Sequence, residues 1–184
     1  PPQVPPAASY AGGAGVGPRV VPGTYTVKMM KDRSVYETKL DLVPDARVTH
    51  TAADRQAQFD LTMKVHAQLG TMTTAINRIN AVRSGLLDRT AKVGPKDALA
   101  KKLQAALAQV DALRMKIVAT KEGGMITGEE RLREHMANLY GELTGYEGRP
   151  TQTQIERADA LSRELADVVR DFDAWVKNEL PAIN

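Results

Sequence analysis

Signals that start and stop helices recur at regular intervals after Thr49. Three threonines are each followed three positions later by a carboxylate or an amide: Thr51 with Asp54, Thr127 with Glu130, and Thr151 with Gln154. Such pairs satisfy free backbone N–H groups at a helix N-terminus. Glycine and proline interrupt the chain at 94–95, 123–124, 145–150 and 181. These signals predict four helices, at about 52–91, 95–121, 128–145 and 151–180.

Apolar residues recur every three or four positions in the predicted helices, which places them on one face of each helix. The second helix carries Leu99, Leu103, Ala106, Val110, Leu113 and Ile117, and the third carries Leu132, Met136, Leu139 and Leu143. The fourth carries Ile155, Ala158, Leu161, Leu165, Val169, Phe172 and Val176. Because short connections make consecutive helices antiparallel, we expect a mainly α fold in which residues 49–184 form an antiparallel, up-down-up-down four-helix bundle.

The first 48 residues have a different character. Residues 1–23 are rich in proline and glycine, which favours an extended, irregular segment. Apolar and polar residues then alternate on both sides of a polar turn at 31–34, which predicts a β-hairpin with one apolar face. Two strands alone are marginally stable in water, so we expect residues 1–48 to end a larger β-sandwich or to dock on the helices.

The predicted first helix is unusually long, about 60 Å at 1.5 Å per residue. No other predicted helix can cover that length, so we expect its amino-terminal part, residues 53–69, to leave the bundle and contact the hairpin or the domain to which the hairpin belongs. The residues expected to make this interdomain contact are Tyr25, Val27, Tyr36, Leu40, Phe59 and Met63.

The stretch from Val65 to Asn77 contains no charged residue. Its composition suggests contact on more than one side. An alternative use of this stretch is an exposed apolar surface for oligomerisation or for a partner, formed by Val65, Leu69, Met72 and Ile76.

Charge and composition narrow the classes of partner. The formal net charge is +3, and residues 51–184 carry 19 basic and 18 acidic side chains with their signs interleaved, which argues against a nucleic-acid partner. No run of 18 apolar residues is present, so no membrane span is predicted. The absence of cysteine excludes disulfides and thiolate chemistry. The start at Pro1, without a signal peptide or an initiator Met, is interpreted as the start of a fragment of a longer chain.

The sequence contains no recognisable catalytic or metal-binding motif. The histidines, His50, His66 and His135, have no second metal ligand three or four positions away. Glu130 and Glu134 share a helix face but lack the Glu-x-x-His spacing of di-iron bundles, so they are interpreted as solvated carboxylates. No serine has a general base at helical spacing. We therefore expect no cofactor, no metal and no catalysis in this chain; a metal-dependent bundle enzyme is a remote alternative.

Two segments resemble a known family. They are Gly17-Pro18-Arg19-Val20-Val21-Pro22-Gly23-Thr24-Tyr25-Thr26-Val27-Lys28-Met29 and Leu40-Asp41-Leu42-Val43-Pro44-Asp45-Ala46-Arg47-Val48, followed by Ala53-Asp54-Arg55-Gln56-Ala57-Gln58-Phe59-Asp60-Leu61. The phrases resemble the carboxy-terminal region of bacterial secreted proteins with sortilin-like or BNR (Asp-box) β-propellers, often labelled glycosyl hydrolases. The resemblance covers residues 17–90, with a departure at Ala46, where the family has proline.

The resemblance implies that the hairpin ends an immunoglobulin-like sandwich and that the helices form a tail behind it. It implies an extracellular or periplasmic location and contact with upstream propeller and sandwich domains. No propeller, Asp-box or candidate glycosidase carboxylate lies within these residues, so no catalytic residue is carried over. We expect a non-catalytic accessory module that works by packing and protein interaction.

Overall fold

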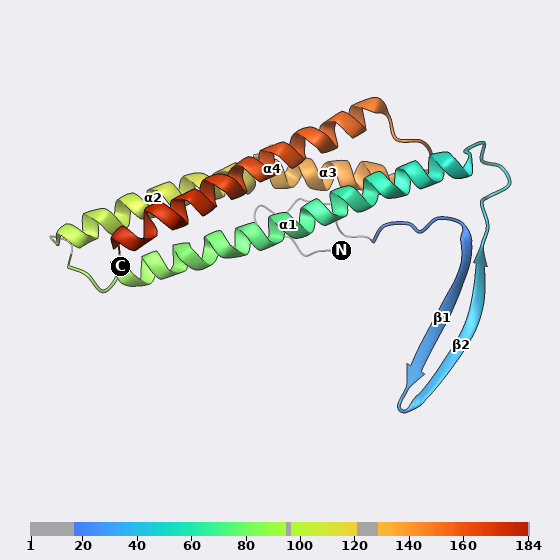
Figure 1. Ribbon diagram of the computed structural model, residues 1–184, viewed down its shortest axis with the longest axis horizontal. Coiled ribbons are helices and arrows are strands. Elements are labelled where there is room, and N and C mark those ends of the chain that lie inside the picture. The colour runs from blue at the N-terminus through green and yellow to red at the C-terminus, as the bar shows by residue number, and fades with distance from the viewer. Residues whose placement is uncertain (1–16, 95–96, 121–128, 184) are drawn as a thin grey trace.

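The computed structural model describes residues 17–94, 97–120 and 129–183, and it is mainly helical (Figure 1). A two-stranded antiparallel sheet comes first, with β1 at Gly23–Lys31 and β2 at Ser34–Leu42. Four α-helices follow: α1 at Ala52–Thr90, α2 at Ala98–Ile117, α3 at Leu132–Gly145 and α4 at Gln152–Asn178. A short 3₁₀ helix, η2, spans Leu180–Ile183. The predicted hairpin and the predicted set of four helices are confirmed.

Two of the three predicted helix-starting pairs act as caps. The Thr51 hydroxyl accepts a hydrogen bond from the backbone N–H of Asp54, whose carboxylate accepts one from the N–H of Thr51, both at 3.1 Å. Thr151 and Gln154 make the same reciprocal pair at α4, at 3.2 and 3.0 Å. Each pair satisfies two backbone donors that have no partner within the helix.

The other two helices begin differently from the prediction. Thr127 lies outside the described residues, and α3 begins at Leu132, where the Glu134 carboxylate accepts a hydrogen bond from the N–H of Arg131 at 2.9 Å. Helix α2 is capped by Asp97, whose carboxylate accepts a hydrogen bond from the N–H of Leu99 at 2.8 Å. Both caps use a carboxylate at the positive end of the helix dipole.

Helices α1 and α4 run parallel to each other. Lys64 pairs with Asp159, and Arg78 pairs with Asp173 at 2.6 Å, and both pairs join residues 95 positions apart. A constant offset between contacting residues requires two helices that point the same way. Figure 1 shows the same arrangement, with both helices starting at the end of the bundle that carries the hairpin.

Helices α2 and α3 run opposite to α1. Arg83 donates to Asp111 at 2.6 Å and Arg114 donates to Asn80 at 3.1 Å. Residue numbers therefore increase along α2 where they decrease along the neighbouring part of α1. Helix α3 meets the amino-terminal half of α1, and α2 meets its carboxy-terminal half (Figure 1). The helices are therefore not arranged up-down-up-down, and that part of the prediction is wrong.

Helix lengths give the physical reason. At about 1.5 Å per residue, the 39 residues of α1 span about 58 Å, and the 20 residues of α2 and 14 residues of α3 together span about 51 Å. Two short helices placed one after the other cover the long helix, and a cross-section of the bundle meets three helices. The amino-terminal part of α1 stays in the bundle, which corrects the expectation that it leaves.

The core lies between α1, α4 and the consecutive pair α2 and α3, and the predicted apolar faces form it. Most predicted core positions of α2, α3 and α4 are buried; Leu99, Leu113, Val169 and Val176 pack partly buried against the core, and Ile155 is exposed. Trp175 is buried, and its indole N–H donates to Gln109 on α2 at 2.7 Å. Full burial of each large apolar side chain contributes about 1.5–3 kcal/mol, which supports a stable helical unit.

Candidate functional site

One face of the β-hairpin, the polar face, carries three polar cross-strand pairs, followed at its tip by exposed Met30 and Val35. Thr24 donates to Asp41 at 2.6 Å, and Lys39 donates to Thr26 at 2.6 Å. The next pair along the same face is an ion pair between Lys28 and Glu37, also at 2.6 Å. In each case the two residues are direct cross-strand partners. Such pairs stabilise a hairpin from its solvent side.

The opposite face of the hairpin is apolar and exposed. Cross-strand register places Tyr25 opposite Leu40, and Met29 opposite Tyr36, with Val27 between them. We call these five residues the apolar face. Val27, Met29, Tyr36 and Leu40 are each between 44% and 56% exposed, a large share for apolar side chains that lie together. A contiguous exposed apolar patch is typical of an interaction surface.

The edges of the hairpin are also open. β1 pairs only with β2 in the described residues, so the outer backbone N–H and C=O groups of both strands have no strand partner. Unpaired strand edges accept a further strand readily. The hairpin therefore offers an apolar face and two edges to a partner.

The structure does not bring the hairpin to the helix residues expected to meet it. Tyr25, Val27, Tyr36 and Leu40 share one face as predicted, but neither strand packs against a described helix. The hairpin projects from one end of the bundle (Figure 1). Phe59 is half-buried and Met63 is exposed, both on α1. The expected contact between the two groups is not formed within this chain.

The proposed partner surface on the uncharged stretch of α1 is corrected by the structure. Val65, Leu69, Met72 and Ile76 are each 1% exposed or less, and all belong to the core. They occupy the inner side of α1, where α2, α3 and α4 cover them. These four side chains are therefore not available to a partner, although other uncharged residues of the stretch, such as Ala67, Thr71 and Thr74, are exposed.

A cavity of about 460 Å³ lies where the hairpin joins the helices. Val21, Leu42 and Val48 contribute apolar wall, and Arg55 and Glu147 contribute charge. Glu147 accepts from Arg19 at 3.3 Å and lies 3.9 Å from Arg55, so one carboxylate holds the segment before β1 and the start of α1. These contacts attach the base of the hairpin to the bundle while its apolar face stays uncovered.

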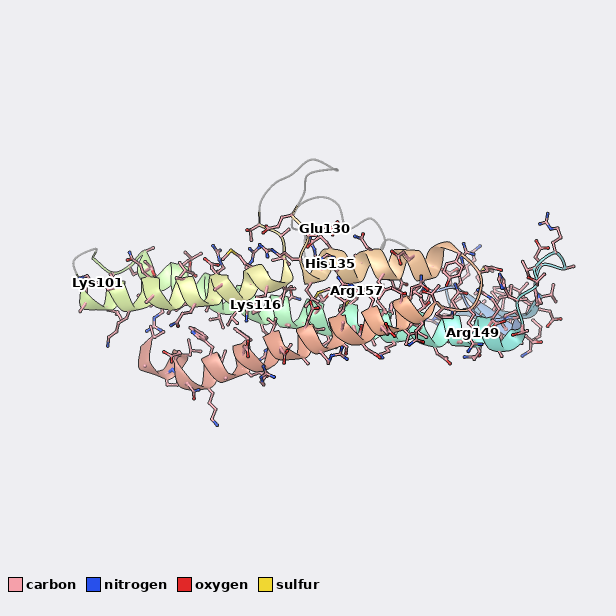
Figure 2. All side chains as sticks on the ribbon, turned by 90° about the horizontal axis from the view of Figure 1, so that it is seen from above. Lys101, Lys116, Glu130, His135, Arg149 and Arg157 are labelled. Atoms are coloured by element: carbon pink, nitrogen blue, oxygen red, sulfur yellow. The ribbon has the colours of Figure 1, made fainter. Side chains whose placement is uncertain are left out.

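Two of the three histidines have close side-chain neighbours. His66 packs beside Tyr140 with ring centroids 6.1 Å apart, and His135 lies 3.4 Å from Glu130 at the start of α3 (Figure 2). Burial raises the pKa of the Tyr140 hydroxyl. Among the described residues, no group of three or more His, Asp or Glu side chains is placed to hold a metal ion.

Within the same residues, no helix is both long and apolar enough to cross a membrane.

Five polar residues are buried in the described part of the chain, and the sequence did not predict this for any of them: Gln58, Thr62, Arg133, Glu134 and Thr144. Gln58 is buried at the junction of α1 and α3, and Arg133 and Glu134 form a buried ion pair at the start of α3. Glu134 is therefore not the solvated carboxylate that its spacing from Glu130 suggested. For Gln58 a signal exists: it occupies the same helix face as Leu61 and Val65.

Comparisons of the sequence with protein-family models and with curated proteins, and of the fold with solved structures, found no match.

Proposed function

We propose that this chain is a non-catalytic interaction module, in which the hairpin docks through its apolar face on a β-rich neighbouring domain and the helices form a rigid support. The observation that carries the proposal is the difference between the two hairpin faces. One face pairs its polar side chains across the strands and carries exposed Met30 and Val35 only at its tip, whereas the other face is apolar along its length from Tyr25 to Met29. A hairpin alone is marginally stable in water, and covering such a face with a partner would stabilise it further.

The neighbouring domain best suited to this surface is a β-sandwich. A sandwich lacking its last two strands presents an apolar layer and an open strand edge, which match the apolar face and the free edge of β1 or β2. The resemblance of residues 17–90 to the tails of secreted BNR-propeller proteins supports an immunoglobulin-like sandwich as that domain. On this proposal the chain works outside the cytoplasm, as part of a larger propeller protein.

The test is binding between this chain and the region that precedes it in the parent coding sequence, produced as a separate polypeptide. Isothermal titration calorimetry should show binding with a negative heat-capacity change, the mark of apolar burial. Tyr36→Lys, which places a charge in the apolar face, should weaken binding by about tenfold or more.

Val35 provides a matched control, because it neighbours Tyr36 but lies on the polar face and is 58% exposed. Val35→Lys should leave binding unchanged. Absence of binding by the unsubstituted chain, or equal weakening by both substitutions, would contradict the proposal.

A further inference from the structure

A shallow groove of about 700 Å³ runs between α1 and α4 on the outside of the bundle. Its floor and walls include Gln68 and Thr71 of α1, and Leu165, Ala166, Val169 and Lys177 of α4. The ion pairs Lys64–Asp159 and Arg78–Asp173 bridge the two helices on either side of it, about 21 Å apart along the helices. We call this surface the outer groove.

The α1 residues that line the outer groove, Gln68 and Thr71, are uncharged. Ala67 and Thr74 are exposed beside it on α1, and α4 contributes exposed Ala166 and Ala174. Small side chains allow another helix to approach closely. The groove also contains an unexplained polar atom: Gln68 Oε1 is buried and is the only buried side-chain oxygen or nitrogen in the described residues without a hydrogen-bond partner. Such atoms are rare in native structures and call for an explanation.

Four charged residues of α4 at or beside the outer groove are arranged with opposite signs about a midpoint, whereas Arg170, which also lines the groove, comes opposite Ala166. Position 168 is midway between Asp159 and Lys177, and also midway between Arg163 and Asp173. A second α4 lying antiparallel with its midpoint at the same place would bring residue 177 of one copy to residue 159 of the other, and residue 163 to residue 173. Both pairings join a cation to a carboxylate.

The four charged side chains can each form a further ion pair. Lys177 and Arg163 have no carboxylate within ion-pair distance among the described residues. Asp159 and Asp173 hold Lys64 and Arg78 through Oδ1, and the Oδ2 of each accepts no hydrogen bond from described residues. Each carboxylate can therefore accept a second cation without releasing the first.

Gln68 also has a counterpart in this register. Because α1 lies beside α4 at an offset of 95 positions, the midpoint on α1 is position 73, which is midway between Gln68 and Arg78. Arg78 donates one N–H to Asp173 and has others available. In an antiparallel pair of chains, Arg78 of the second copy comes opposite Gln68 across the groove, while Gln68 Oε1 itself stays buried within each copy.

We propose that two copies of this chain associate through the outer groove, with α1 and α4 of one copy antiparallel to α1 and α4 of the other. The contact is isologous, so each pairing occurs twice about a two-fold axis. The four helices form a second core layer on the side of α1 and α4 that faces away from α2 and α3. This interaction uses a surface separate from the hairpin and goes beyond the docking function proposed above.

Charge reversal tests the register directly. Sedimentation equilibrium of the full chain, from low micromolar to several hundred micromolar, should show a monomer–dimer equilibrium. Lys177→Glu alone and Asp159→Lys alone each set like charges against each other twice in a homodimer, and should weaken dimerisation by about tenfold or more. An equimolar mixture of the two variants should dimerise as well as the unsubstituted chain, because each copy then offers the charge that the other lacks.

The matched controls are Lys101→Glu on α2 (Figure 2) and Asp88→Lys on α1, which are exposed and lie outside the outer groove. Alone or mixed they should leave the dimer unchanged. A chain that is monomeric throughout, or two groove variants that do not recover on mixing, would overturn the proposal. Loss of the dimer in Tyr36→Lys would also overturn it, since self-association would then belong to the hairpin.

Discussion

The side-chain nitrogen of Gln58 on α1 lies 2.8 Å from the carbonyl oxygen of Leu143 on α3, although the two residues are 85 positions apart. The same nitrogen donates to the carbonyl oxygen of Tyr146 at 2.6 Å. Both carbonyls belong to the carboxy-terminal end of α3, where backbone acceptors have no partner within the helix. Gln58 is 4% exposed, so it replaces water at this helix end and ties the start of α1 to the end of α3.

Substitution Gln58→Ala should therefore destabilise the fold. Two carbonyls would lose their donor, and we expect the free energy of unfolding in urea to fall by about 1–3 kcal/mol. Gln56 is the matched control: it is exposed, and its side chain bonds only Asp60 on its own helix. Gln56→Ala should change the free energy of unfolding by less than about 0.5 kcal/mol. Equal losses in the two variants would show that the bond to α3 contributes nothing.

Local signals in the sequence predicted the elements of this fold well, because caps and apolar spacing act within one helix. The pairs at Thr51 and Thr151 form as expected, and so does the alternating hairpin. The direction of α3 was not predictable in this way. It depends on the combined length of α2 and α3 against α1, a property of three separate segments, and on contacts such as Gln58 to Leu143 that only the folded chain brings together.

The candidate site was likewise predicted only in part. Alternation of side chains correctly placed Tyr25, Val27, Tyr36 and Leu40 on one face, because a strand has a period of two regardless of its surroundings. The prediction that Val65, Leu69, Met72 and Ile76 form an exposed surface is wrong. A stretch without charge is typical of a buried core face and also of an exposed contact face, so its composition does not distinguish the two. Burial of that stretch depends on three other helices, which local sequence does not specify.

The buried ion pair between Arg133 and Glu134 should be sensitive to loss of one partner. The Arg133 Nε donates to the Glu134 carboxylate at 2.6 Å, and Arg133 is 2% exposed. Arg133→Met leaves a buried carboxylate without its cation, so we expect a loss of about 3–5 kcal/mol in the free energy of unfolding. Arg157→Met, at an exposed arginine of α4 (Figure 2), should cost far less. Guanidinium denaturation of both variants distinguishes them, and equal midpoints would contradict the prediction.

Acid should weaken the start of α1 through Asp54. Hydrogen bonds from the hydroxyl and the N–H of Thr51 hold the pKa of the Asp54 carboxyl below its ordinary value of 3.8. A carboxyl with a lowered pKa in the folded state stabilises the fold above its unfolded pKa, and this contribution is lost as the pH falls from about 3.8 through the folded value. Asp54→Asn should therefore flatten the fall in Tm over that pH range.

Asp88 gives the control for this pH dependence, because it is exposed and near the other end of α1. Asp88→Asn should keep the acid limb of the Tm profile as it is in the unsubstituted chain. Thr51→Val should act like Asp54→Asn, since it removes the hydroxyl that lowers the pKa. A Tm profile that falls identically in all four proteins would exclude a role for this cap.

The connection between α3 and α4 requires glycine at position 148. Its φ is +154°, a region that side chains disfavour, and a Cβ placed there would lie 2.9 Å from the ring of His50. Gly148→Ala should lower the free energy of unfolding by about 1–3 kcal/mol. Gly145→Ala, three residues earlier, meets no atom within 4 Å and should be neutral or slightly stabilising. Combining Gly148→Ala with His50→Ala removes the clash but keeps the strained φ, so the double variant should recover only part of the loss. Full recovery would assign the whole effect to the contact with His50, and no loss in Gly148→Ala would show that this loop adjusts its backbone freely.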